Sequence, residues 1–538
     1  MNRTAALLTV WAASCCTVVA LLGVATAPSV ARADVPNLTP HLVKDIDPTN
    51  ANSNVNNLLG VATSVGDTFY FRFSDGSTGA GHGVELWRTD GTDAGTSMVK
   101  DIRTGTPNGF PQSLVNIGNG QMIFNATTGT TQAGAAGAEP WISDGTDAGT
   151  FQLKDIFPGT SSSNPGSFAK SGDTVFFRAT SPDTLDELWK TDGTTAGTQL
   201  VKDIHPGHTL GGVGTSNFGS NPTEMTAISG GRVLFVADDF FTPNQPGGTV
   251  GTFDREVWVS DGTANGTFRV KDINPNGATA APTNLRRFSG DTLLFTATNV
   301  DTGRELYRTD GTTAGTQLVK DINPGSGSST PGSVFMNNGV GYFAAGDGVH
   351  GTELWRTDGS EAGTQLVKDI NPGSGNSSIG NSIVSYHDRL WFSANDGTHG
   401  TELWSSDGTD AGTEMFRDFV AGTGNSTPLS LTVFNDLLFF VTIAPIPGDT
   451  YVTGTLWATD GTQDGTQMVA QTPAPANGYG FYDLNVVGNS LYFVASNGID
   501  TNGRAANYEL FAITVPEPTF GAALLIAPLL LARRRRAL

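Results

Sequence analysis

The chain has 538 residues, 69 of them glycine and only 15% of them charged, and its 51 acidic against 30 basic residues give a formal net charge of −21 at pH 7. This charge excludes nucleic acid as a partner, because binding it depends on basic contacts to phosphate. Both cysteines, Cys15 and Cys16, lie in an N-terminal apolar run, so disulfides, cysteine metal sites and a cysteine nucleophile are excluded for the mature protein.

Residues 1–33 have the layout of a secretory signal peptide. Arg3 provides the positive start, residues 5–24 are largely apolar, and Ala31-Arg-Ala33 is a small-x-small cleavage site. The sequence therefore predicts export.

Residues 34–514 are dominated by a repeat, of which one copy reads Glu353-Leu-Trp-Arg-Thr-Asp-Gly-Ser. The aspartate of this motif recurs at 90, 144, 192, 261, 310, 358, 407 and 460, a spacing of 48 to 54 residues with one 69-residue exception. Each copy contains a weak strand, an aromatic strand, the Glu-Leu-Trp strand and a Val-Lys-Asp-Ile strand after a glycine-rich turn. Four short antiparallel strands at this period predict a blade of an all-β propeller.

The two ends of this region complete the pattern. Residues 42–46 are a Val-Lys-Asp-Ile strand without a Glu-Leu-Trp before it, and residues 509–511 are a Glu-Leu-Phe without a strand after it. If these two strands pair, the ring closes and no sheet edge stays open. We therefore expect nine units with the N-terminal strand closing the ring; eight blades, with one unit packed differently, is the alternative.

A charged pair recurs within the repeat. The glutamate lies 15 residues before the lysine, as in Glu353 and Lys368, and both are lost together in the copy with Thr455 and Ala470. Opposite charges that face each other on a hairpin attract. We interpret Glu353 and Lys368 as a structural cross-strand pair, and Glu509 with Lys44 as its counterpart across the ring closure.

The repeated tryptophan is expected to form core between blades, and the aspartate of the turn to accept hydrogen bonds from its own turn. No cofactor is predicted. The alternative for the acidic turns is Ca²⁺, which prefers oxygen ligands, with the candidates Asp347, Asp358, Asp396 and Asp407. His82, His350 and His399 each stand three residues before a repeat glutamate, and we expect a loop role for them rather than metal ligation.

Residues 515–538 form a separate tail. Pro516-Glu517-Pro518 precedes fourteen mostly apolar residues and then Arg533, Arg534, Arg535 and Arg536. A helix of that length spans about 21 Å, which is short of a hydrocarbon core of about 30 Å. The tail therefore predicts a transient anchor, and a lasting membrane helix is the alternative.

Two resemblances rest on these motifs. Residues 42–513 resemble the bacterial ELWxxDGT-repeat proteins, and the last 24 residues are similar to a PEP-CTERM sorting signal. The second resemblance implies recognition by an exosortase, removal of the tail, and delivery to the cell surface or the exopolysaccharide matrix. Neither resemblance implies a catalytic residue.

The first functional hypothesis is a non-enzymatic binding or structural module at the cell surface or in the extracellular matrix, with polysaccharide or surface proteins as partners. The alternative is a glycan hydrolase or lyase on the propeller scaffold. Such an enzyme needs two carboxylates about 5 to 10 Å apart, which would break the repeat pattern. The acidic residues considered for this role are Glu224, Asp238 and Asp239.

Overall fold

A computed structural model describes residues 38–46, 61–76, 81–129, 136–206, 219–240, 253–275, 279–380, 382–445, 451–475, 480–499 and 505–514. The chain divides into residues 1–37 and a unit that begins at Leu38. In the described part of that unit every regular element is a β-strand. No helix among the described residues is long and apolar enough to cross a membrane.

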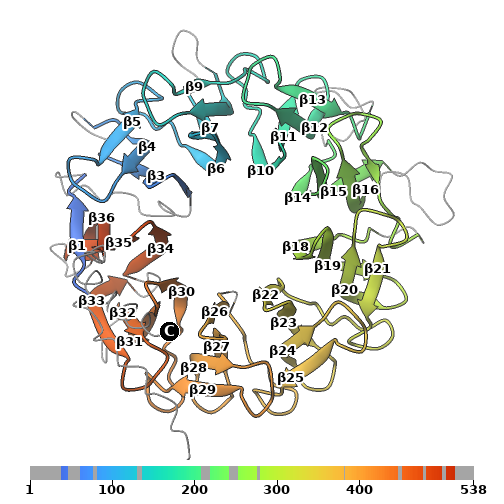
Figure 1. Cartoon of the computed structure of the whole chain (residues 1–538), viewed down its shortest axis with the longest axis vertical. Coiled ribbons are helices and arrows are strands. Elements are labelled where there is room, and N and C mark those ends of the chain that lie inside the picture. The colour runs from blue at the N-terminus through green and yellow to red at the C-terminus, as the bar shows by residue number, and fades with distance from the viewer. Residues whose placement is uncertain are drawn as a thin grey trace, which may run out of the picture. The chain divides into compact units, whose positions relative to one another are not determined.

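The strands form nine four-stranded antiparallel sheets, which are the nine blades of a propeller (Figure 1). Blades one to three, from the innermost strand outward, are β2 (Ala62–Val65), β3 (Thr68–Ser74), β4 (Val84–Thr89) and β5 (Ser97–Lys100); β6 (Gln112–Gly118), β7 (Gln121–Thr127), β8 (Ala138–Ser143) and β9 (Phe151–Gln152); and β10 (Gly166–Ser171), β11 (Thr174–Ser181), β12 (Leu185–Thr191) and β13 (Gln199–Lys202).

Blades four to six are β14 (Thr223–Ile228), β15 (Arg232–Phe240), β16 (Phe253–Ser260) and β17 (Phe268–Arg269); β18 (Thr283–Ser289), β19 (Thr292–Asn299), β20 (Gly303–Thr309) and β21 (Gln317–Lys320); and β22 (Phe335–Asn337), β23 (Val340–Gly346), β24 (Thr352–Thr357) and β25 (Gln365–Lys368).

Blades seven to nine are β26 (Val384–Tyr386), β27 (Arg389–Asn395), β28 (Thr401–Ser406) and β29 (Glu414–Arg417); β30 (Leu429–Phe434), β31 (Leu437–Pro445), β32 (Tyr451–Thr459) and β33 (Gln467–Pro475); and β34 (Phe481–Val487), β35 (Ser490–Ile499), β36 (Ala505–Thr514) and β1 (His41–Lys44). The ninth blade thus takes its outer strand from the N-terminal end of the described chain. The predicted closure and the count of nine are confirmed, and the alternative of eight blades is wrong.

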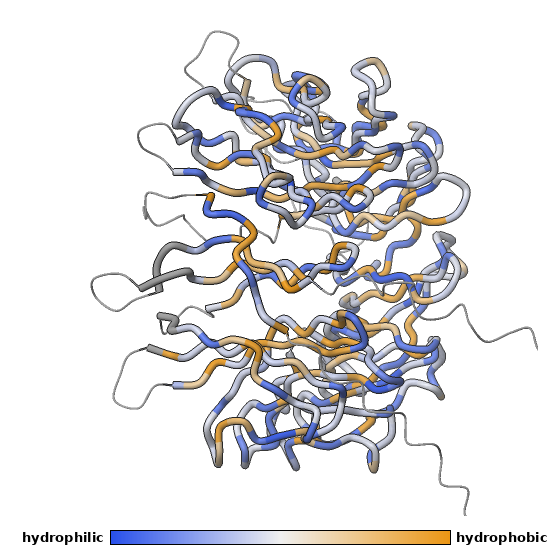
Figure 2. Tube along the Cα trace, turned by 60° about the vertical axis from the view of Figure 1, so that its left-hand side comes forward, coloured by the Kyte–Doolittle hydropathy of each residue, from blue (hydrophilic) through white to orange (hydrophobic). Residues whose placement is uncertain are grey.

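The hydrophobic core lies between the blades. One buried cluster combines Phe71 and Trp87 of blade one with Tyr492 and Leu510 of blade nine, and similar clusters join later neighbours. This confirms the expected place of the repeated tryptophan. A second aromatic position is also constant: the second strand of every blade has a fully buried phenylalanine opposite the tryptophan position, at 71, 124, 177, 235, 295, 343, 392, 440 and 493. Short hydrophobic and hydrophilic stretches alternate along the chain (Figure 2).

The repeat glutamate holds the chain where it leaves one blade for the next. In blade six, Glu353 is fully buried, and its carboxylate accepts hydrogen bonds from the backbone N–H groups of Ile370 at 2.8 Å and Ser377 at 3.1 Å. Ile370 follows the fourth strand, and Ser377 begins the approach to blade seven. The same latch joins Glu509 to the Ile46 N–H at 3.0 Å across the ring closure.

The predicted pairing of Glu353 with Lys368 is wrong, and so is that of Glu509 with Lys44. Lys368 lies opposite Leu354, because the register shifts by one residue between Leu354 and Trp355. A one-residue offset turns Glu353 to the other face of the sheet. Lys368 Nζ instead reaches the next blade, where Asp410 Oδ1 lies 2.9 Å away and the Asp410 carbonyl 3.1 Å away.

Lysines at this position therefore connect neighbouring blades. Lys44 binds Asp93 at 2.9 Å, and Lys320 donates to the Thr364 carbonyl at 2.9 Å. The approach between blades is close: Gly408, at φ 86°, has no room for a Cβ beside the hydroxyl of Tyr342. Glycine is suited to this turn because it adopts a positive φ without strain and has no Cβ.

The latch and the lysine contact predict different costs of mutation. Glu353→Ala leaves the buried Ile370 N–H without an acceptor, while the Ser377 N–H keeps the Thr352 carbonyl at 3.0 Å, and we expect a loss of about 1–3 kcal/mol in the free energy of unfolding. Lys368→Ala removes a partly exposed ion pair, and the expected loss is below about 1 kcal/mol. Denaturant unfolding of the single and double variants measures both. A coupling above about 1 kcal/mol between the two residues would contradict the separate roles.

The latch also predicts how stability depends on pH. Burial raises the pKa of Glu85 to about 8 and those of Glu139, Glu187 and Glu353 to about 7, although their backbone donors oppose the rise. A raised folded-state pKa gives stability that is complete below about pH 4.5 and is lost as the pH rises through about 7 to 8. The melting temperature should therefore fall between pH 5 and 9, and Glu353→Gln should fall less. Equal slopes for the two proteins would refute this origin.

Candidate functional site

Blade four departs from the repeat at three positions around its glutamate, Glu256. Two residues before it stands Asp254, where five other blades have glycine, and thirteen residues after it stands Arg269, where most copies have leucine or methionine. Ala280 replaces the serine that follows the glutamate by 24 residues in four other blades. Comparison of this copy with the others would have revealed these changes, which the search for acids outside the repeat missed.

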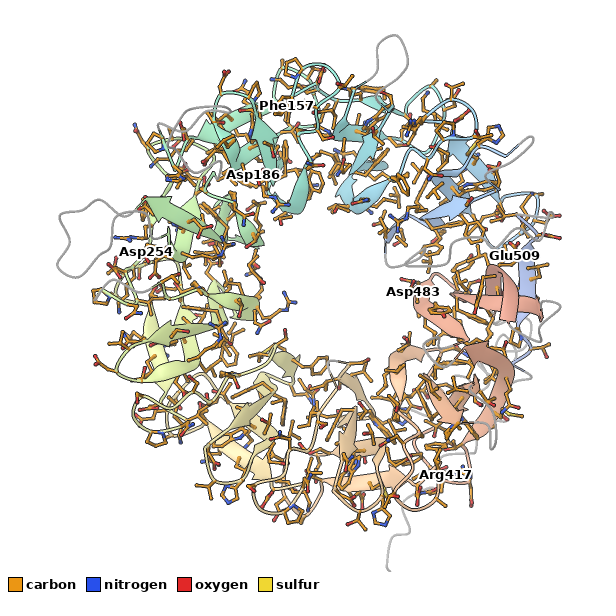
Figure 3. The ribbon with its side chains drawn as sticks, turned by 180° about the vertical axis from the view of Figure 1, so that it is seen from behind. Phe157, Asp186, Asp254, Arg417, Asp483 and Glu509 are labelled. Carbon is orange, nitrogen blue, oxygen red and sulfur yellow. The ribbon has the colours of Figure 1, made fainter. Side chains whose placement is uncertain are left out.

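Asp254 forms an acidic cluster with two residues of the repeat itself, Glu256 on the third strand and Asp272 just after the fourth strand. One carboxylate oxygen of each lies within 4.8 Å of those of the others. Arg269 Nη1 is 2.7 Å from Asp254 Oδ2, and its Nη2 is 3.8 Å from Asp272 Oδ2. Asp254 lies away from the central opening (Figure 3). The side chains of Asp254 and Asp272 are 12% and 26% exposed, so the cluster can be reached from solvent.

The latch of Glu256 is incomplete. One oxygen, Oε1, accepts from the Ile273 N–H at 3.2 Å, while Oε2 has no hydrogen-bond partner in the described structure. With Ala280 in place of serine, the hydroxyl donor of the other blades is missing. Asp254 Oδ1 and Asp272 Oδ1 are likewise buried without a partner. Each of the three acids thus keeps one unused oxygen.

The charges in the cluster separate the pKa values of its members. Burial raises the pKa of Asp254 to about 6; Asp272 and Asp239 add to the rise, and Arg269 opposes it. Burial is the main cause that raises the pKa of Glu256 to about 9, and the charge of Asp254 adds to the rise. Glu256 is therefore protonated at neutral pH, and Asp254 changes its charge between pH 5 and 7.

The acids proposed from the sequence lie near this cluster without forming it. Asp239 pairs with Asp254 in the strand register, and Asp238 Oδ2 binds Arg255 Nη1 at 2.7 Å. Glu224 Oε2 accepts from the Leu285 N–H of the next blade at 3.3 Å. None of the three is a member of the cluster, although Asp238 and Asp239 lie on β15 of the same blade.

The four candidates for calcium lie elsewhere. Asp358 Oδ1 accepts from Ser360 N at 2.9 Å, in agreement with a self-capped turn, and Asp407 is bound in the same way. Asp347 and Asp396 accept from the backbone of His350 and His399 and lie 2.7 Å from their Nδ1 atoms. Among the described residues the one acidic group compact enough for an ion contains none of the four. Calcium at these turns stays a prediction, and the sorting residues 516–518 and 533–536 lie outside the described residues.

No family model and no curated protein matches the chain. Similar solved structures include a puromycin hydrolase (TM-score 0.38, 13% identity, 75% of this chain and 61% of that one) and a Mycobacterium tuberculosis puromycin-hydrolyzing peptidase (0.36, 11%, 87% and 62%). Another is the β-propeller domain of the Trilobed protease from Pyrococcus furiosus (0.31, 10%, 67% and 95%). The chain thus spans less than two thirds of the length of the first two.

These comparisons correct the first functional hypothesis. The structures found are described as a hydrolase and peptidases, and none of these as a binding or structural module, so the non-enzymatic first hypothesis is set aside; their descriptions do not extend to the alternative, a glycan hydrolase or lyase. TM-scores below 0.4 assign no activity to this chain. Whether and how it acts has to be argued from the blade-four carboxylates.

The pairing of Asp254 with Arg269 can be tested by restoring the repeat. Arg269→Leu leaves the largely buried Asp254 without its cation, and we expect a loss of about 2 kcal/mol in unfolding free energy at pH 8, less than the 3–5 of a fully buried pair. The double variant Asp254→Gly/Arg269→Leu has the residues found at these positions in blade five. It should regain at least half of the unfolding free energy that Arg269→Leu loses. A double variant no more stable than the single one would contradict this coupling.

Proposed function

We propose that the protein is a carboxylate-dependent glycan hydrolase whose reaction centre is the blade-four cluster. The supporting observation is that Asp254, which stands where five other blades have glycine, brings a carboxyl group of raised pKa to within 4.8 Å of Asp272, and that both aspartate side chains are partly exposed. Carboxyl groups with pKa values pushed apart mark acid and base roles.

In this proposal Asp254 is the general acid. Its pKa of about 6 lies close to the working pH, where proton transfer in both directions is most efficient. Asp272 is the second carboxylate, and Arg269 positions both. Glu256 is neutral below its pKa of about 9, so it adds no negative charge next to Asp254 and Asp272. The spacing within 4.8 Å is nearer the roughly 5 Å of retaining glycosidases than the 6.5–9.5 Å of inverting ones.

The reaction then has two steps. Asp254 donates its proton to the glycosidic oxygen while an Asp272 oxygen forms a bond to the anomeric carbon, and the alcohol of the leaving sugar departs. In the second step Asp254 accepts a proton from water, whose oxygen attacks the anomeric carbon and releases Asp272. The proton of the acid is restored, and one glycosidic bond has been hydrolysed with retention.

We further infer that this activity is exported. A signal peptide over residues 1–33 and a sorting tail over residues 515–538 with its Pro516, Glu517 and arginine cluster support secretion, processing by an exosortase-type enzyme, and action at the cell surface. Extracellular polysaccharide is the substrate class that such a location provides.

A second candidate is a divalent-cation site at the same cluster. Three carboxylate oxygens without hydrogen-bond donors, one of them on the fully buried Glu256, are what an oxygen-preferring cation such as Ca²⁺ would satisfy. Ca²⁺ needs six to eight ligands, so water would complete the shell.

The hydrolase is tested with purified residues 34–514 on a panel of polysaccharides, by release of reducing ends at pH 6. Asp254→Asn and Asp272→Asn should each lower kcat at least about 100-fold. Asp321→Asn, the matched aspartate of blade five, should leave it unchanged. No release from any glycan, or full activity of both variants, refutes the proposal. Heat of Ca²⁺ binding that is lost in Asp254→Asn without any hydrolysis would support the second candidate instead.

A further inference from the structure

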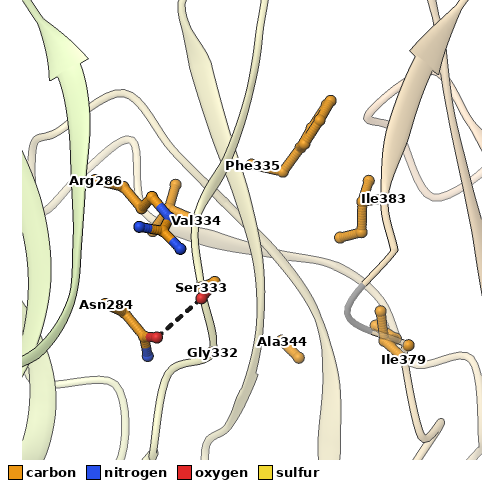
Figure 4. A pocket seen from close by; sticks show the side chains of 10 residues that line it. Asn284, Arg286, Gly332, Ser333, Val334, Phe335, Ala344, Ile379 and Ile383 are labelled. Carbon is orange, nitrogen blue, oxygen red and sulfur yellow. Dashed lines mark hydrogen bonds between the residues drawn. The ribbon is translucent and has the colours of Figure 1, made fainter. Parts of the chain in front are cut away.

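A pocket of about 500 Å³ opens between the inner parts of blades five, six and seven (Figure 4). This volume is typical of small-molecule sites, which range over about 300–1,000 Å³. Its walls come from β18, from the segment that enters β22, and from the segment that leads to β26. None of these residues belongs to blade four, which holds the acidic cluster.

The two sides of the pocket differ in chemistry. One side has Arg286 together with Asn284, whose Oδ1 accepts from the Ser333 hydroxyl at 2.8 Å. The other side is apolar and includes Phe335, Ile379 and Ile383, which pack against the core between blades six and seven. A ligand that fills this space meets a cation at one end and hydrocarbon at the other.

Arg286 is a departure from the repeat. In each blade one residue of the innermost strand pairs with the residue just before the constant phenylalanine, and these positions hold Thr63, Val115, Ala169, Thr226, Arg286, Phe335, Val384, Thr432 and Asn485. Arg286 is the charged member of this set. Phe335, which also lines the pocket, holds the same position in the next blade.

The guanidinium of Arg286 is available for a ligand. Its recorded hydrogen bond is a long one, 3.4 Å from Nη1 to its neighbour's carbonyl at Leu285. Among the described residues no carboxylate forms an ion pair with it; Asp291 pairs with Arg232 and Arg287, and Glu224 is bound to the Leu285 N–H. Arginine presents a planar fork of donors that matches a carboxylate.

We propose that this pocket binds a small organic carboxylate with an apolar body. Arg286 receives the carboxylate, and Phe335, Ile379 and Ile383 receive the apolar part. The site is separate from the proposed reaction centre, so the two proposals can fail independently.

The test uses 3-phenylpropionate as the probe and calorimetry of purified residues 34–514. We expect a dissociation constant of about 1 mM or tighter, within the range for a ligand of this size. Its uncharged amide should bind about tenfold more weakly or worse. Glucuronate, which has the charge without the apolar body, should bind more weakly than the probe.

Variants assign the binding to Arg286. Arg286→Met should weaken 3-phenylpropionate about tenfold or more, while the matched control Arg287→Met, at the neighbouring exposed arginine, should leave it unchanged. Phe335→Leu should weaken binding a few-fold and keep the preference for the charged probe. If Arg286→Met does not fold, Arg286→Gln takes its place. Undetectable binding at 20 mM (about 20 times the expected constant), equal affinity for the amide, or glucuronate binding as tightly as the probe would each overturn the proposal.

Discussion

A buried carboxylate that accepts two backbone N–H groups is the interaction on which the rest of the ring depends. Each repeat glutamate binds the amide where its own fourth strand ends and, in most blades, the amide where the chain approaches the next blade. The first of these amides, such as that of Ile370, lies beyond the end of the fourth strand, and a buried N–H without an acceptor is costly. The second, such as that of Ser377, is shared between the glutamate and a carbonyl of the third strand. In the eight blades that have it, the glutamate therefore fixes the point at which the chain leaves the fourth strand.

Blade eight lacks the repeat glutamate, and its chain follows a different path after the third strand. There Thr455 replaces the glutamate, and the fourth strand β33 runs for nine residues instead of turning after four. Thr455 pairs with Gln471, and Ala470 stands opposite Leu456, so the backbone amides are used in the ladder. A glutamate is absent where the turn that it would hold is not made. The loss of glutamate and lysine together, read from the sequence as a broken pair, reflects this change of path.

The repeat made the architecture predictable. Its period, its turns and the two incomplete copies at the ends were sufficient for nine blades and for the pairing of β1 with β36, because strand order in a propeller follows sequence order. Side-chain partners were not predictable from spacing, since the one-residue register shift at Leu354 and Trp355 reverses which residues share a face. At the candidate site, Asp238 and Asp239 were considered because they lie outside the repeat, whereas Asp254 and Arg269 are recognised as departures only when blade four is compared with the other blades.

The ring closure has a consequence for the order of folding. The contact between Ile46 and Glu509 joins residues 463 apart in the chain, and closing such a loop in an unfolded chain costs roughly 3 kcal/mol more entropy than closing a hairpin of 16 residues. Successive blades reduce this cost as they form, because the curved row of finished blades brings its two ends together. Blade nine is then the last to form during synthesis, and until it does, Phe71 and Trp87 of blade one lack their partners from blade nine. If translation stalls within roughly the last sixty codons, eight blades are present and the hydrophobic face of blade one is exposed to solvent. An exposed hydrophobic face of this kind favours aggregation and proteolysis.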